Sequence, residues 1–169
     1  MQLRTCILSA FTLSTALFFG LAAMAGELPK EGTYKGTYAG VGTFKINRIG
    51  KGSLVFFDET GLATTDGLFD HTTSRCWGTG DWMEHVGIDQ GYCMATDLAG
   101  DKIFQKFLTE KHTPDQKHWS VSVTCTGGTG KYTGISCDET DITYMNEFPA
   151  APEGTYVDYG TIQGSYKLP

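Results

Sequence analysis

Side chains that could do chemistry concentrate between residues 70 and 92, a segment with two of the four histidines and two of the three tryptophans. Aromatic rings around a cavity mouth could hold a small ligand, while ionisable groups orient it or move a proton. The candidate ligand-binding residues are His71, Arg75, Trp77, Trp82 and Tyr92, and the candidate catalytic residues of this segment are Arg75, Glu84 and His85. The competing interpretation is that residues 78–91 form a long solvated loop with exposed charges.

A further catalytic candidate, Glu59, follows an apolar run. Alternation from Val55 and Phe57 places Glu59 on their face, where burial would raise its pKa and suit it to proton transfer. The alternative is a solvated turn in which Asp58 and Glu59 precede Gly61.

Metal binding and nucleophilic hydrolysis are both disfavoured. The histidines form no His-x-His or His-x-x-x-His pair that could hold an ion tightly, so no metal is expected. His112 and His118 flank a Thr-Pro-Asp-Gln turn, and both are expected to be exposed. No Gly-x-Ser-x-Gly sequence is present to build a serine nucleophile.

The first 25 residues predict a secretory signal peptide. Arg4 precedes an apolar stretch over residues 7–21, and Ala23-Met24-Ala25 matches a small-x-small cleavage site. We therefore expect a secreted or periplasmic protein, cleaved after Ala25, whose residues 26–169 form a single domain. The alternative is an N-terminal membrane anchor.

Four cysteines follow this segment, at positions 76, 93, 125 and 137. An even number in an exported chain predicts two disulfides, and three connectivities are open. Local pairing of Cys76 with Cys93 and of Cys125 with Cys137 is the simplest. The second bond would close a Gly-rich reversal and add roughly 3 kcal/mol of stability. The spacings fit no zinc site.

Composition and charge narrow the classes of partner and of fold. The net charge is −6, with no basic stripe that could meet phosphates, so neither nucleic acid nor an anionic membrane is an expected partner. The chain contains 22 glycines and no amphipathic helical segment of ten or more residues. These features favour a compact β protein.

Period-two alternation predicts about eight or nine strands joined by short turns. The expected ranges are 33–39, 41–47, 53–59, 72–78, 91–96, 102–109, 118–126, 142–147 and 159–168. So many strands in one small domain predict an all-β fold, a closed antiparallel barrel of about eight strands. A barrel of that size can hold one small ligand.

The two ends of the chain predict where the barrel closes. Residues 32–38 and 160–166 share a pattern in which a large residue, a glycine and a tyrosine follow one another on one face. A neighbouring aromatic ring can cover such a glycine. We therefore expect the first and last strands to pair.

The segment from Gly127 to Gly134, Gly-Gly-Thr-Gly-Lys-Tyr-Thr-Gly, resembles a turn of the allene oxide cyclase-like barrel superfamily, which includes the plant dirigent proteins. The turn is expected to need positive φ angles, with Tyr132 as a packing anchor. The resemblance implies an eight-stranded barrel with an apolar cavity open at one end. It also implies cyclisation or radical coupling of small hydrophobic molecules without a metal or organic cofactor, and homo-oligomers. Outside this turn the chain departs from the plant enzymes, and none of their catalytic residues can be assigned.

Three functions remain open at this point. The first is a barrel that binds a small hydrophobic or aromatic molecule, and the second is a cofactor-independent isomerase, cyclase or lyase. The third is a structural or protein-interaction module. An ionisable group such as Glu59, Arg75 or His85 projecting into a cavity would favour the second, an apolar cavity the first, and a solid core the third.

Overall fold

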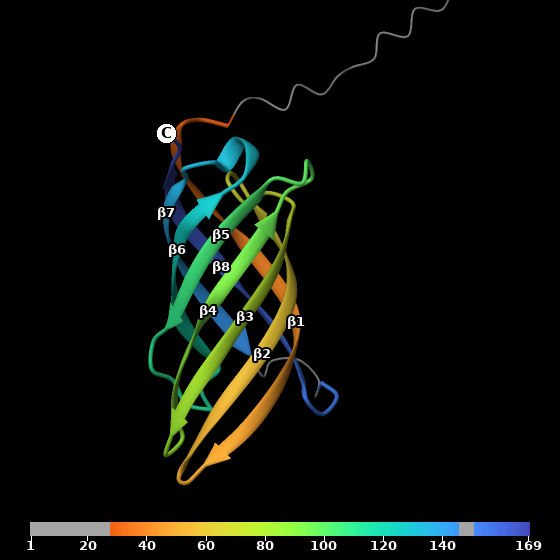
Figure 1. Ribbon diagram of the computed structural model, residues 1–169, viewed down its shortest axis with the longest axis vertical. Coiled ribbons are helices and arrows are strands. Elements are labelled where there is room, and N and C mark those ends of the chain that lie inside the picture. Colours follow the sequence, from red (N-terminus) through yellow and green to blue (C-terminus); the bar gives the residue numbers. More distant parts are fainter. Residues whose placement is uncertain (1–27, 146–150) are drawn as a thin grey trace, which may run out of the picture.

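Eight antiparallel strands close a barrel in sequence order in the computed structural model, which describes residues 28–145 and 151–169 (Figure 1). The strands are β1 (Glu31–Ile49), β2 (Gly52–Thr65), β3 (Thr72–Met83), β4 (Val86–Thr96), β5 (Lys102–Thr109), β6 (His118–Gly128), β7 (Ser136–Met145) and β8 (Thr155–Lys167), with a 3₁₀ turn η1 at Gly130–Tyr132. The expected fold class is confirmed. The predicted signal peptide lies outside the described residues.

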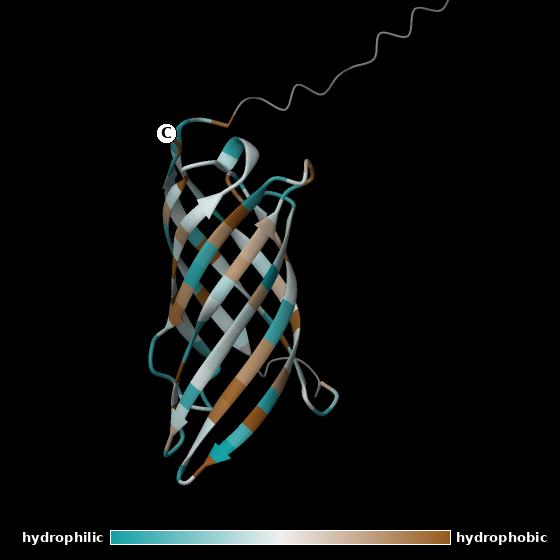
Figure 2. Cartoon of the chain, in the orientation of Figure 1, coloured by the Kyte–Doolittle hydropathy of each residue, from teal (hydrophilic) through white to brown (hydrophobic). Residues whose placement is uncertain are grey.

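Hydrophilic and hydrophobic residues alternate along the strands (Figure 2). On β6 this alternation buries Trp119, Val121 and Val123, and it leaves Ser122 and Thr124 exposed. One face of each strand therefore builds the barrel interior, as a period of two requires.

Three stretches expected to lie outside strands belong largely to strands instead. β1 runs unbroken through Gly40 and Gly42, and β2 continues through Asp58 and Glu59. Residues 78–91 belong to β3 and β4 and turn only at Glu84 and His85, whose φ angles are 49° and 73°. The loop and turn interpretations of these stretches are wrong, because all of these residues except Glu84 and His85 are paired with a neighbouring strand.

The first and last strands pair as expected. In the register of β1 and β8, Tyr34 lies opposite Gly164, Tyr38 opposite Gly160, and Gly32 opposite Tyr166. A Cβ atom at Gly164 would lie 2.6 Å from the Tyr34 hydroxyl. Glycine on one strand thus makes room for tyrosine from the other, and this complementarity specifies the seam.

One end of the barrel is filled by side chains. Leu68 and Phe69, from the β2–β3 connection, are 2% and 3% exposed and pack in one core cluster with Tyr34 and Tyr132. The expected reversal after β6 is confirmed, with positive φ angles at its glycines 127, 130 and 134. Tyr132 is its buried anchor and donates a hydrogen bond of 3.1 Å from its hydroxyl to Asp97 Oδ2.

Both predicted disulfides are present. Cys76–Cys93 joins directly opposed residues of β3 and β4, with their Cα atoms 4.1 Å apart, and Cys125–Cys137 joins β6 to β7. Two disulfides are consistent with an oxidising compartment. Within the two described ranges, no helix has the length and apolar character needed to cross a membrane.

Candidate functional site

A cavity of about 510 Å³ occupies the barrel interior between the filled end and the opposite end. All eight strands contribute to its wall. The apolar part includes Phe57 and Phe107, whose ring centroids lie 6.0 Å apart, and the Cys76–Cys93 disulfide. Phe44 and Ile46 line the cavity yet stay 37% and 47% exposed, so the cavity opens to solvent at their end of the barrel.

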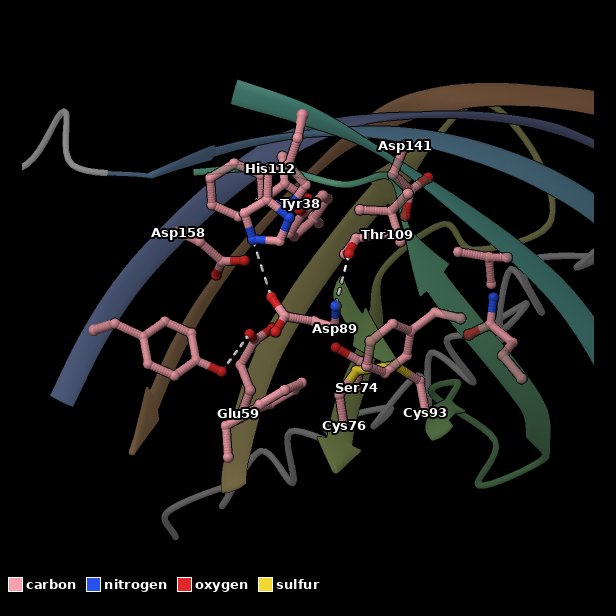
Figure 3. Close-up of a pocket in the computed structure, with 18 of the residues that line it drawn as sticks. Tyr38, Glu59, Ser74, Cys76, Asp89, Cys93, Thr109, His112, Asp141 and Asp158 are labelled. Carbon is pink, nitrogen blue, oxygen red and sulfur yellow. Dashed lines mark hydrogen bonds and ion pairs between the residues drawn. A yellow bond between two sulfur atoms is a disulfide. The ribbon is translucent and has the colours of Figure 1, made fainter. Parts of the chain in front are cut away.

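Two carboxyl groups meet on one side of this cavity. Glu59 projects inward from β2, as its alternation with Val55 and Phe57 predicts, and Asp158 projects inward from β8 (Figure 3). A Cβ atom at Gly40 would lie 2.6 Å from Glu59 Oε1 and 2.6 Å from Asp158 Oδ1. Gly40 lies on β1 between those two strands, so its lack of a side chain lets the carboxyls approach each other.

The surroundings of this pair favour its protonated form. Burial, followed by the charge of Glu59, raises the pKa of Asp158 to about 8. Burial also raises the pKa of Glu59, although a hydrogen bond of 2.9 Å donated by the Tyr156 hydroxyl to Glu59 Oε2 opposes that rise. Asp158 is 5% exposed, and its Oδ1 has no hydrogen-bond partner among the described residues. The pair can therefore hold a proton near neutral pH and exchange it with a ligand.

A second pair of carboxyls, Glu139 and Asp141, lines the cavity from β7. Glu139 accepts hydrogen bonds from the Tyr34 hydroxyl at 2.8 Å and from Gln105 Nε2 at 3.4 Å. Burial raises the pKa of Glu139 to about 7. Burial, the charge of Glu139 and a hydrogen bond to it raise the pKa of Asp141 to about 9. The cavity thus has a second group of carboxyls that are protonated near neutral pH.

His112 is buried at the open half of the cavity, so its expected exposure is wrong. The β5–β6 connection folds back and pairs with Gly87, which brings His112 to 2% exposure. Its ring stacks on Trp119 with centroids 4.2 Å apart and meets the edge of Trp82. His118 is exposed, as expected.

The contacts of His112 suit its protonated form. Nε2 lies 3.2 Å from Asp89 Oδ2 (Figure 3), and Nδ1 lies 3.1 Å from the Glu110 carbonyl oxygen. Burial lowers the pKa of His112, but the hydrogen bonds to Asp89 and Glu110 outweigh it and leave the pKa raised. His112 therefore neutralises Asp89 when it is protonated.

The ligand-binding candidates of the sequence mostly lie outside the cavity. Trp82 lines it, whereas Arg75, Trp77 and Tyr92 lie on the outer face because their neighbours Cys76 and Cys93 point inward. Arg75 donates two hydrogen bonds, of 3.0 and 2.7 Å, to Asp58. The prediction that these three side chains surround the cavity mouth is therefore wrong. Alternate residues of a strand point to opposite faces, and these residues are on the outer face.

The other three candidates are also exposed. His71 Nδ1 lies 2.8 Å from Asp70 Oδ1 in the β2–β3 connection. Glu84 pairs with Lys51 at 3.3 Å, and His85 lies beside Glu84 in the β3–β4 turn. None of the three lines the cavity.

Sequence reasoning missed Glu139, Asp141 and Asp158, and a signal for the first two was present. Cys137 begins the alternation that continues through residues 139 and 141 to Thr143, so these positions share its face. Within residues 28–145 and 151–169, no three His, Cys, Asp or Glu side chains are placed to hold a metal ion. No family model, curated protein or solved structure matches the chain.

Proposed function

We propose that this protein is exported and binds a small hydrophobic or aromatic molecule inside its barrel. The cavity of about 510 Å³, with apolar walls and an opening at one end, carries this proposal. Its volume falls within the range of small-molecule sites, which combine apolar walls with a few placed polar groups. The predicted signal peptide, the two disulfides and the resemblance to the allene oxide cyclase-like barrels support it.

The wall suits an apolar ligand for a physical reason. Apolar side chains that face the cavity would contact a bound ligand instead of solvent. They include Phe57, Phe107, Val121 and Val123. Burial of apolar surface contributes roughly 25 cal/mol per Å², so a ligand of modest size could bind from its apolar area alone. A barrel with a solid core, the arrangement expected of a purely structural module, would offer no such surface.

A second candidate function is cofactor-independent isomerase, cyclase or lyase chemistry, favoured by the Glu59–Asp158 pair. Of two adjacent carboxyls with raised pKa values, one can act as a general base and the other as a general acid. The ionised carboxylate would accept a proton from the substrate, and the protonated carboxyl would return one at another atom. The proton transfer would then take place at Glu59 and Asp158, since Arg75, Glu84 and His85 do not line the cavity.

The binding proposal is tested with the mature, disulfide-bonded protein. We expect mass spectrometry of gently purified protein to detect a bound apolar molecule. We also expect a thermal-shift screen of phenolics, terpenoids and small aromatic compounds to raise Tm with at least one class. If no molecule co-purifies and no compound raises Tm, the proposal fails.

The enzymatic candidate needs a separate readout. Once a ligand is identified, its turnover should be abolished by Glu59→Gln or Asp158→Asn, measured at ligand concentrations that saturate each variant. If the unsubstituted protein binds the ligand but does not convert it, the enzymatic candidate fails and the binding function stands.

A further inference from the structure

We propose that the ligand carries a positively charged nitrogen on its apolar body, and that this nitrogen binds at Glu59 and Asp158. This inference rests on the proposed binding function and names the chemical class of the ligand. It follows from the carboxyls of the cavity wall, from the unpartnered Oδ1 atom of Asp158 and from the aromatic rings around that atom.

Any charge carried by the carboxyls of the wall is negative. Glu59, Glu139, Asp141 and Asp158 all line the cavity, and none of them is in an ion pair with a cationic side chain of the described residues. No lysine or arginine of the described part of the chain lines the cavity. His112 is a cation when it is protonated, but Asp89 already faces it at 3.2 Å. A cationic ligand would therefore stabilise the ionised form of these carboxyls, whereas a carboxylate ligand would oppose their ionisation.

Two oxygen atoms in this wall, Asp141 Oδ1 and Asp158 Oδ1, lack a hydrogen-bond partner among the described residues, and the second of them lies beside Glu59. Asp158 is 5% exposed, and its Oδ1 accepts no hydrogen bond from any described residue. A buried polar atom without a partner costs free energy, which a ligand N–H group can recover. Glu59 Oε1 lies beside it across Gly40, so an ammonium group could contact both carboxyls.

Aromatic rings flank the same place. The Tyr156 ring lies against Gly42, where a side chain would overlap it, and its hydroxyl binds Glu59. Phe44 lies 6.4 Å from Tyr156, between centroids, and Tyr38 also lines this part of the wall. Carboxyls framed by aromatic rings suit an organic cation, because the ring faces attract positive charge and cover the adjoining carbon atoms.

Three probes of similar shape test the inference. 2-Phenylethylamine is protonated at pH 7, 2-phenylethanol is neutral, and phenylacetate is an anion. We expect titration calorimetry with the mature protein at pH 7.5 to show the amine binding at least about tenfold more tightly than the alcohol, a difference of about 1.4 kcal/mol. Phenylacetate should bind more weakly than both.

Asp158→Asn should remove the preference for the amine and leave the affinity for the alcohol unchanged. Asp138→Asn is the matched control, because Asp138 is exposed on the outer face of β7 and should preserve the preference. If Asp158→Asn does not fold, as judged by near-UV circular dichroism, Glu59→Gln replaces it with the same expected result.

The outcomes separate this inference from the binding function. Equal or tighter binding of the alcohol, or a preference that survives both Asp158→Asn and Glu59→Gln, overturns the cation site and leaves the binding function standing. Binding of none of the three probes also overturns the cation site, while the co-purification and thermal-shift results decide the binding function independently.

Discussion

The carboxyl groups of Glu59 and Asp158 approach each other across β1, from the strands on either side of it. Each has an oxygen atom 2.6 Å from the position that a Cβ atom would take at Gly40. The pair therefore depends on a glycine that belongs to neither of its strands.

Gly40→Ala should destabilise the barrel by on the order of 1–3 kcal/mol, because the new methyl group overlaps both carboxyl oxygens. Urea denaturation of the disulfide-bonded protein measures the change. In a Glu59→Ala, Asp158→Ala background the same substitution should cost less, since the overlapping groups are gone. An equal cost in both backgrounds would contradict the geometry described above.

Stability should fall as pH rises from about 5 to about 8. The pKa values of Glu139, Asp158 and Asp141 are about 7, 8 and 9 in the folded protein, and these side chains ionise near pH 4 when unfolded. Over this range the folded state holds more protons than the unfolded state, so raising the pH favours unfolding. Each carboxyl contributes a slope of up to about 1.4 kcal/mol per pH unit.

The free energy of unfolding, measured in urea at several pH values, checks this expectation. Asp141→Asn should reduce the slope, whereas Asp138→Asn, on the outer face, should leave it unchanged. A stability that increases steadily from pH 5 to 8 would show that the interior carboxyls are ionised in the folded state.

Filling the cavity should abolish binding without unfolding the protein. Val123 points into the cavity from β6, and the next residue, Thr124, points outward. Val123→Trp should place its ring in the ligand volume and eliminate the thermal shift given by any compound that binds the unsubstituted protein. Thr124→Trp is the matched control and should retain the shift. Loss of the shift in both variants would place the ligand elsewhere.

Replacing Cys76 and Cys93 together by alanine should lower the free energy of unfolding by roughly 3 kcal/mol, because their bond closes a loop with a sequence separation of 17. Denaturation under non-reducing conditions gives the value. A loss under about 0.5 kcal/mol would indicate that the paired β3–β4 hairpin already restrains these residues in the unfolded chain.

The barrel, its seam and both disulfides could be predicted because each leaves a local signal in the sequence. Alternation shows a strand, and the Gly-x-Tyr patterns at the two ends of the chain show which strands complement each other. It is harder to predict which face of a strand points into the barrel, since a period of two does not distinguish the inner face from the outer one. The inward direction of the disulfide-bonded Cys76 and Cys93 would have placed Arg75, Trp77 and Tyr92 outside.

The buried carboxyls and His112 were harder to predict because their environment is made by distant parts of the chain. Asp158 becomes buried only when β8 closes on β1 and brings it beside Glu59, a residue 99 positions earlier. His112 becomes buried through its bridge to Gly87. A polar residue in a sequence is usually expected at the surface. These residues become buried only through contacts between distant parts of the chain.

One end of the barrel is filled by the side chains of Leu68, Phe69 and Tyr132. These side chains also restrict the path that a ligand could take into and out of the cavity. Under the proposed function, a ligand that enters past Phe44 and Ile46 would meet this filled end and leave by the way it entered. If the barrel binds a ligand as proposed, the width of the opening beside Phe44 and Ile46 would set the rates of both association and dissociation.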